Sequence, residues 1–361
     1  MVRRQTFGLS RVALSTGLGI AMSFDSRSFD ESVAPFHALM QAGDYEAACS
    51  LAMRISEQPL TECPEASREL LFETFFRRLH RGYRGQYQGL DFEVCDYRMF
   101  CFSPSLMLFR GPRPAVEHLT GGKYLTIFGA AQLFGRFHAN PFHMMVQQEL
   151  GLPVLNLSVG GAGPEFYLKE EFIGAANRGR GVVLQVLSGR SIGCEEYPGG
   201  RVTARAGSED PRRDRIELLT SIWLQDRQEA ARLIAKWRVN YLDAMSRLIR
   251  SIRVPVFLVW MSSRRPSDWS VELSRNDPDF GAFPQLVSRD MVDELASLAT
   301  SYTELSPDPC PTFPLMSRLT GMPCPFWEPN GRPMWVNSYY PSAVPHRELF
   351  NRLSPSLAAL V

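Results

Sequence analysis

Four short apolar runs that follow residue 120 constrain the fold of this chain more than any other feature. They read YLTIFGAA, PVLNLSV, GVVLQVLSG and VPVFLVWMS, and they begin at Tyr124, Pro153, Gly181 and Val254. Each is rich in Val, Leu and Ile and nearly continuous, which is typical of strands covered on both faces. Helical segments such as NPFHMMVQQELG and PEFYLKEEFIGAANRG separate them. This alternation predicts an α/β fold with a parallel sheet and right-handed crossovers.

A long helix is expected before the fourth run. Its apolar residues recur at helical spacing, and on one face the pattern places Leu233, Trp237, Tyr241, Met245, Leu248 and Ile252. Such regular periodicity predicts a helix packed against the core of the sheet domain.

Length and charge exclude several classes of protein. The chain has 361 residues, 45% of them hydrophobic and 21% charged, which is typical of a soluble globular protein with a sizeable core. Lys plus Arg number 39 and Asp plus Glu 38, and a net charge of +1 argues against a nucleic-acid partner. No run of apolar residues reaches the ~18 that a spanning helix needs, so we expect no membrane span.

Cysteine and glycine patterns bear on cofactors and location. The seven cysteines form no CxxC pair, which predicts buried thiols in a reducing, cytoplasmic compartment. His and Cys do not occur at metal-ligand spacing, so we expect no metal. The loop GAAQLFGRF has no Lys and no Ser or Thr, which argues against a P-loop sulfotransferase or another nucleotide-dependent transferase. We therefore predict no cofactor.

The N-terminal part differs from the rest of the chain. Residues 1–25 are basic, with no acidic residue before Asp25, and we expect a disordered or targeting-like segment there. Residues 26–85 include FHALMQAGDYEAACSLAMRI, whose spacing predicts a helical hairpin as a small appendage. Residues 86–361 are expected to form the α/β domain.

Candidate ligand-binding residues follow the four runs. In an open parallel sheet, ligands bind beyond the carboxyl ends of the strands. The tails here are GAAQLFG, SVGGAGPEF, SGRSIGCEEY and SSRRPSDW, rich in Gly, Ser and Arg. Glycine lets backbone N–H groups approach a ligand, although tight turns use the same residues. The predicted substrate-binding residues are Gly129, Ala131, Gln132, Gly161, Gly189, Arg190, Ser191 and Arg264.

The order of these segments resembles that of the GDSL/SGNH hydrolases, flavodoxin-like proteins that cleave or transfer ester groups. The resemblance implies a three-layer sandwich. GAAQ stands where those enzymes carry Gly-Asp-Ser-Leu, so Ala131 replaces the serine nucleophile. Gly161 and His346 match later blocks of the pattern. Arg190 replaces the Asn that helps to hold the oxyanion, and Ala343 replaces the Asp three residues before the histidine.

A closer resemblance is to a bacterial family of SGNH-like proteins that lack the serine. Its pattern has counterparts throughout this chain, at Gly129–Gly135, Asn156–Phe166, Gln185–Ser191, Trp260–Pro266, residues 280–287 and Tyr339–His346. The resemblance implies that the missing serine is a property of the group. It also implies an association with surface-polysaccharide and sulfotransferase-type genes.

Two functions remain open. Ala131 offers no alkoxide, so a Ser-dependent hydrolase is not expected, and whether the protein is an enzyme stays open. The first function is direct transfer of an acyl or sulfo group to a sugar hydroxyl. His346 would be the catalytic base, while Gln132 and Arg190 hold a negative donor group. The second is a non-catalytic module with a degenerate SGNH pocket. Both predict a glycan or a small anionic ligand as the partner.

Some of these residues have alternative roles. Ser188 and Ser191 could serve as nucleophiles, but neither lies on the elbow after the first strand. His346 precedes the helical segment RELFNRL and could simply cap that helix.

Overall fold

We describe a computed structural model of the chain. The described residues are 13–15, 21–23, 35, 38, 42, 94–98, 100–102, 107–192, 194–195, 215–268, 280, 283–306, 313–318, 321–323, 326–327 and 333–361. Within residues 1–25, β1 (Ala13–Ser15) pairs antiparallel with β2 (Ala21–Ser23). The rest of that segment and the predicted helical hairpin at 26–85, apart from three isolated positions, lie outside the described residues, so the domain boundaries stay predictions.

Five parallel strands form the central sheet. They are β5 (Leu125–Phe128), β6 (Val154–Asn156), β7 (Gly181–Gln185), β8 (Val256–Met261) and β9 (Ser301–Leu305). Their order is β6-β5-β7-β8-β9, and every neighbouring pair is parallel. The crossover from β5 to β6 and back to β7 places β5 inside the sheet, as in flavodoxin-like folds. The predicted α/β sheet is confirmed.

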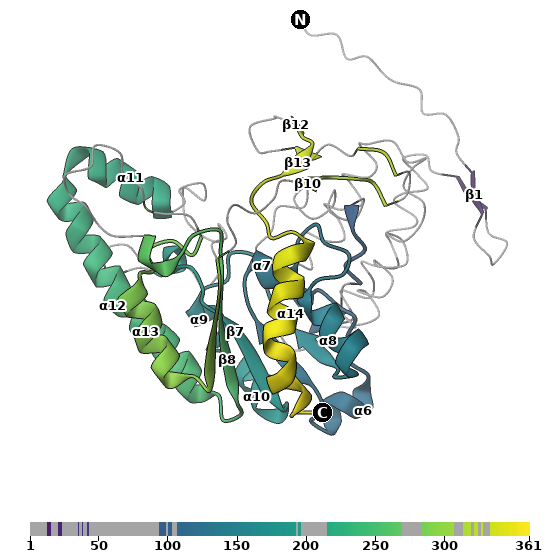
Figure 1. Cartoon of the computed structure of the whole chain (residues 1–361). Coiled ribbons are helices and arrows are strands. Elements are labelled where there is room, and N and C mark those ends of the chain that lie inside the picture. The colour runs from purple at the N-terminus through teal and green to yellow at the C-terminus, as the bar shows by residue number, and fades with distance from the viewer. Residues whose placement is uncertain are drawn as a thin grey trace, which may run out of the picture.

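Helices cover both faces of this sheet and complete three layers (Figure 1). α8 (Phe142–Leu150) and α14 (Ala343–Ala358) cover one face. On the other face lie α9 (Pro164–Tyr167), α10 (Glu170–Arg178), α12 (Arg227–Ser251) and α13 (Arg289–Leu298). Successive strand side chains point to opposite faces, so Ile127 packs in the first core and Phe128 in the second. The predicted apolar face of α12 is buried, including Trp237 and Tyr241.

β9 was not expected from the sequence. Its residues, Ser-Tyr-Thr-Glu-Leu, lack a continuous apolar run, and only Leu305 is buried. The strand lies at the edge of the sheet and pairs with β8 alone. An edge strand needs less apolar surface than a central one, because one side of it faces no further strand.

Shorter elements surround this framework. They are β3 (Phe100–Phe102), β4 (Met107–Phe109), α6 (Val116–Thr120), α7 (Ala131–Phe134), η2 (Gly189–Ser191), α11 (Arg215–Gln225), η3 (Pro266–Asp268), β10 (Phe313–Pro314), β11 (Phe326–Trp327), β12 (Pro333–Met334) and β13 (Val336–Asn337). β10 pairs with β13 and β11 with β12, both antiparallel. Across the described ranges, the helices are too short or too polar to cross a bilayer.

Candidate functional site

The elbow between β5 and α7 is held by its own protein neighbours. The Ala130 N–H donates to Gln185 Oε1 at 2.8 Å, and the Gly129 N–H donates to the Tyr167 hydroxyl at 3.2 Å. The Gly129 carbonyl accepts from the N–H of Val159 at 2.9 Å. These two N–H groups are therefore bonded to side chains of β7 and α9 and are not directed at a ligand.

Glycine at position 129 allows three strand tails to meet. A Cβ atom there would lie 2.9 Å from Ser158 Oγ and 3.0 Å from Gln185 Oε1. Ser158 follows β6, and Gln185 ends β7. These contacts place polar side chains from both neighbouring strands beside the end of β5, where a ligand of an open sheet is expected.

Ala131, which stands at the nucleophile position, faces an apolar cluster. It packs with Phe137, Leu315 and Tyr340 and is nearly buried. The Tyr340 hydroxyl accepts from Arg136 Nη1 at 2.8 Å, which fixes the ring over the elbow. The C-terminal segment that carries β10 and β13 therefore closes this side of the site.

Three buried polar atoms near the elbow have no hydrogen-bond partner among the residues that the structure describes. They are Gln132 Oε1, Ser158 Oγ and Gln185 Nε2. They come from α7 and from the ends of β6 and β7, which flank β5. An unpartnered buried polar group costs about 1–3 kcal/mol, so these three atoms would gain from hydrogen bonds to a bound molecule or water. Only Gln132 was predicted. Gln185 could have been identified from the sequence, because it is a polar residue at the end of an otherwise apolar strand.

The loop after β7 contains three of the predicted residues, and two serine hydroxyls hold it in shape. Ser188 Oγ accepts from the Arg190 N–H at 3.2 Å and donates to Gln285 Oε1 at 2.6 Å. Ser191 Oγ donates to the Ser188 carbonyl at 3.3 Å, and the Gly189 N–H donates to the Gln285 carbonyl at 2.9 Å. Both hydroxyls form hydrogen bonds that stabilise this loop, and this argues against either serine as a nucleophile. The Arg190 side chain itself is half-buried.

The loops after β6 and β7 touch closely. A Cβ atom on Gly163 would lie 1.8 Å from Ser191 Oγ, so only glycine fits there. Gly161, two residues earlier, has a φ of 76°, which glycine adopts without strain. The predicted residues of these two loops are therefore brought together with the elbow.

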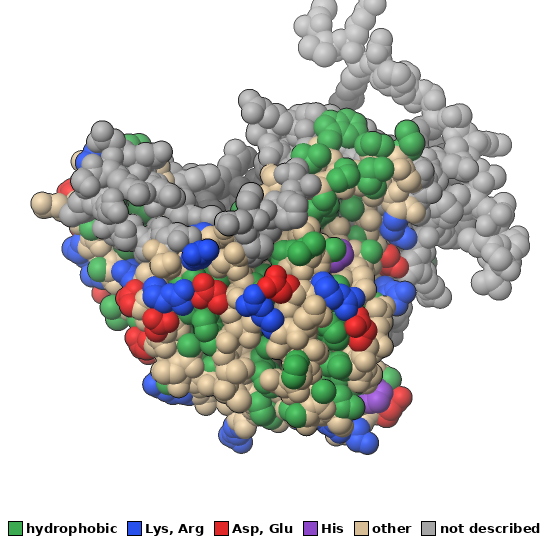
Figure 2. Space-filling view, in the orientation of Figure 1, with side chains coloured by type: hydrophobic (Ala, Val, Ile, Leu, Met, Phe, Trp, Pro, Cys, Tyr) green, Lys and Arg blue, Asp and Glu red, His purple; other side chains and the backbone are tan. Residues whose placement is uncertain are grey.

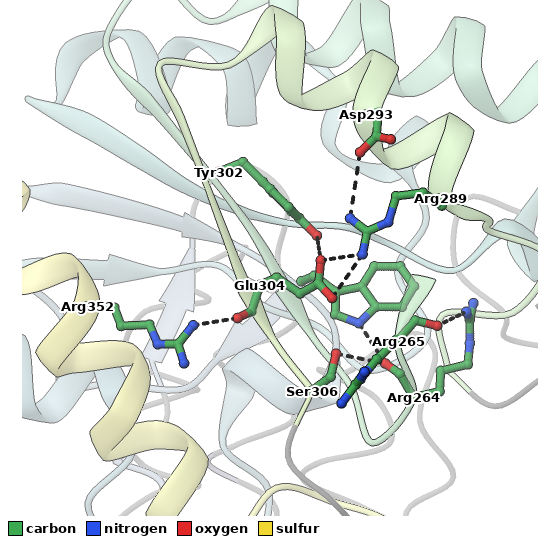
Figure 3. A network of polar contacts seen from close by, with 9 residues as sticks. Arg264, Arg265, Arg289, Asp293, Tyr302, Glu304, Ser306 and Arg352 are labelled. Carbon is green, nitrogen blue, oxygen red and sulfur yellow. Dashed lines mark hydrogen bonds and ion pairs between the residues drawn. The ribbon is translucent and has the colours of Figure 1, made fainter. Parts of the chain in front are cut away.

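Arg264 belongs to a different network. Its guanidinium donates to the carbonyls of Pro284 and of Val287, the latter at 2.7 Å, and lies 4.8 Å from the centre of the Trp260 ring. Its own carbonyl accepts from Trp260 Nε1 at 2.9 Å and from Ser306 Oγ at 3.1 Å (Figure 3). The side chain anchors the segment 283–287 to the end of β8. Its predicted substrate-binding role stays untested, and the geometry supports a structural one.

His346 is fully buried in the first turn of α14, which begins at Ala343 and not after the histidine. Pro345 does not obstruct this start, because N–H groups in the first turn have no partner within the helix. The Phe142 N–H donates to His346 Nδ1 at 3.3 Å, and the His138 ring centre lies 5.2 Å away. Burial, followed by His138, Arg110 and His143, lowers the pKa of His346 well below 6.5. Burial and Arg110 lower that of His138 to about 4.

These contacts fix the tautomer of His346. A neutral imidazole whose Nδ1 accepts a hydrogen bond carries its proton on Nε2. Nε2 is also buried, and it has no hydrogen-bond partner in the described ranges. In this arrangement the ring offers a donor, whereas a general base must offer a lone pair. The proposed alternative of capping α14 is not seen either, since the ring contacts the start of α8.

Among the described residues, no three His, Cys, Asp or Glu side chains gather closely enough to hold a metal ion. Cys95 and Cys194 are buried, and Cys95 Sγ accepts from Arg110 Nη2 at 3.5 Å. Of the predicted site residues, those after β5, β6 and β7 adjoin one another, whereas Arg264 and His346 lie in separate buried networks.

Similarity to solved structures is distant. A carbohydrate esterase family 2 enzyme with a carbohydrate binding domain from Corynascus thermopiles (Myceliophthora fergusii) is 14% identical, with 69% of this chain and 68% of that chain covered and a TM-score of 0.32. A family two carbohydrate esterase from Clostridium thermocellum in complex with cellohexaose is 11% identical, with 70% and 68% covered and a TM-score of 0.32. The lipase Lip_vut3 from a goat rumen metagenome is 12% identical, with 50% and 79% covered and a TM-score of 0.29. These values carry no argument about activity, and the fold assignment rests on the strand order.

No curated protein matches the chain. One protein family does, over residues 86–197 and 216–357, which together make up more than half of the sequence. By this match the chain belongs to the family described as a domain of unknown function, DUF6473.

Proposed function

We propose that this protein is an SGNH-like module that binds a glycan or a small anionic ligand at the carboxyl ends of β5, β6 and β7. The process it would serve is modification of a bacterial surface polysaccharide, as the sequence resemblance implies. A cytoplasmic location belongs to the same proposal and is supported by the seven cysteines, which form no CxxC pair and of which Cys95 and Cys194 are buried.

The observation that carries the proposal is the set of three unpartnered atoms beside the elbow. Gln132 Oε1 can only accept a hydrogen bond, Gln185 Nε2 can only donate, and Ser158 Oγ can do both. A sugar hydroxyl also donates and accepts, so a polyhydroxylated ligand matches all three. Arg190 is half-buried in the loop after β7 and would add affinity for a carboxylate, sulfate or phosphate on the ligand.

Binding fits the geometry better than catalysis does. Ala131 carries no nucleophile and is enclosed by Leu315 and Tyr340. His346 presents a protonated nitrogen in a buried cluster. A site with these properties recognises a ligand without a group poised to attack it.

Glycan-array screening of the purified chain, followed by calorimetry on the sugars that bind, tests the proposal. Gln132→Met keeps the length of the side chain and removes its amide. We expect it to weaken binding about tenfold, the equivalent of ~1.4 kcal/mol for a lost hydrogen bond in a buried site. Arg190→Lys should weaken acidic sugars selectively, because the planar fork is lost while the charge stays. Wild-type protein that binds no sugar on the array, or a Gln132→Met variant that binds as tightly as wild type, would overturn it.

Direct transfer of an acyl or sulfo group is the second candidate, favoured by the half-buried Arg190 in the loop after β7. The acceptor hydroxyl would attack the donor's acyl carbon or sulfur, and the bond to the leaving group would break. The hydroxyl proton would pass to Nε2 of His346, which requires the ring to give up the hydrogen bond from Phe142 and to carry its own proton on Nδ1. Mass spectrometry of a bound glycan incubated with activated acyl and sulfo donors detects the product. His346→Ala should then abolish transfer and retain binding.

Ala131→Ser supplies the control for that candidate. We expect no ordinary esterase activity on a small activated ester, because Ala343 stands where an Asp would orient the histidine and Tyr340 closes over position 131. Turnover at the level of a common esterase would show that the elbow retains a working catalytic arrangement.

A further inference from the structure

A row of aromatic rings leads from the elbow to the surface. The Phe137 ring, which packs on Ala131, lies 5.7 Å from that of Tyr340, and the Tyr340 ring lies 4.9 Å from that of Tyr339. Tyr340 is nearly buried, whereas Tyr339 is 50% exposed. Tyr340 thus contacts the closed side of the site through Phe137 and the exposed ring of Tyr339 on its other side.

The exposed end of this row lies in an apolar surface. Trp335 is 47% exposed, and its carbonyl accepts from the Leu315 N–H at 2.9 Å, which ties it to the segment over the elbow. The large hydrophobic side chains exposed on this segment and the adjoining start of α14 are Met316, Met322, Trp335, Val336, Tyr339 and Val344. Figure 2 shows hydrophobic side chains gathered over β10 and β13.

The turn after β13 holds Tyr339 in place. Asn337 is buried, and its Oδ1 accepts from the N–H groups of Tyr339 at 3.3 Å and Tyr340 at 3.0 Å. Its Nδ2 donates to the Tyr340 carbonyl at 2.7 Å. One amide therefore holds the backbone at both tyrosines. A ring on a backbone held in this way leaves less conformational entropy to be lost when a ligand stacks on it.

We propose that Tyr339 and Trp335 form a stacking platform for the sugar rings of an oligosaccharide whose terminal sugar occupies the elbow site. This proposal rests on the proposed function and extends it from a single sugar to a chain. The C–H face of a pyranose ring is apolar and its edge is polar, which matches the apolar body and polar tip of Tyr and Trp. The platform residues are uncharged, so they select neutral ring faces.

The test compares binding of monosaccharides with that of longer oligomers. The probes are the mono-, tri- and hexasaccharides of those sugar types on a bacterial glycan array that bind the wild-type chain, measured by calorimetry. Wild-type affinity should rise with chain length. Trp335→Ala/Tyr339→Ala should remove that rise, a loss of about tenfold in affinity for the long oligomers, and leave the monosaccharide unchanged. Val336→Ala, which shortens a neighbouring exposed side chain, is the matched control and should bind as wild type.

The outcomes separate the two proposals. If the double variant keeps full affinity for the long oligomers, the platform is wrong and the elbow site stands. If the wild type binds no sugar, the proposed function fails and the platform fails with it. Sedimentation velocity distinguishes the other use of an apolar surface: a wild-type dimer that Trp335→Ala converts to a monomer would overturn the platform in favour of contact between two copies.

Discussion

The loops that follow β5 and β8 are both rich in small and polar residues, yet they use them in opposite ways. After β8, Ser262 Oγ donates to the Phe283 carbonyl, and Arg264 donates to the carbonyls of Pro284 and Val287. Around β5, Gln132 Oε1 and Ser158 Oγ are also buried, but within the described part of the chain they have no hydrogen-bond partner. A buried polar group with partners holds a loop in place. One without partners marks the place where another molecule is expected.

Of the substitutions that test this comparison, Arg264→Ala should cause the largest change in the free energy of unfolding. The change leaves carbonyls of the segment 283–287 without donors and removes the packing on Trp260, so we expect a loss of about 3 kcal/mol in the free energy of unfolding. Urea denaturation measures it. Arg265→Ala changes an exposed side chain next to it and should stay within ~0.5 kcal/mol. If the two variants were equally stable, the anchoring role of Arg264 would be wrong.

Gly163→Ala tests the contact between the loops after β6 and β7. The new methyl group would overlap Ser191, so we expect a loss of ~2 kcal/mol. Ser191→Gly in the same chain should recover most of it, because it removes both the Oγ and the Cβ atom that the methyl meets. Gly174→Ala, within α10, adds a Cβ whose nearest neighbour is Arg178 Nη1 at 3.8 Å, an ordinary contact, and should instead stabilise the protein by ~0.5–1 kcal/mol. Absence of rescue would mean that the loops do not pack as described.

Two serine substitutions, one in each loop region, should change the free energy of unfolding least but compare the two regions most directly. Ser262→Ala leaves the Phe283 carbonyl without its donor and should destabilise the protein by ~1 kcal/mol. Ser158→Ala removes a hydroxyl that has no partner, so in ligand-free protein it should be neutral or stabilising by up to ~1 kcal/mol. Thermal unfolding of both variants under one set of conditions measures the difference. Equal losses would remove the distinction between the two loops.

The sheet was predictable because continuous apolar runs of Val, Leu and Ile have few alternatives to a doubly covered strand. The burial of Leu125, Val183 and Leu258 bears this out. β9 escaped prediction because an edge strand can be half-exposed and polar. A continuous apolar run identifies a strand that is buried on both faces, whereas four of the five residues of Ser301–Leu305 are only half-buried.

The site was predictable only in part. Loop composition indicated the strand tails, but it could not separate Arg264, whose partners lie on the segment 283–287, from Arg190. Such pairings depend on residues distant in sequence. The burial of His346 depends likewise on Phe142 and His138, 204 positions away in the case of the Phe142 hydrogen bond. Spacing relative to a motif places a side chain on an element but does not reveal which of its nitrogens carries a proton.

The polar network on β9 has a consequence for self-association. Arg289 Nη2 lies 2.8 Å from Glu304 Oε2, and Arg352 Nη1 donates to the Glu304 carbonyl at 2.8 Å (Figure 3). That carbonyl is on the outermost strand, where an unoccupied acceptor could recruit the edge of another molecule. Charged side chains from α13 and α14 thus cover part of this edge strand, and the sheet ends there with five strands. This edge of the sheet should therefore resist pairing with the sheet edge of another molecule.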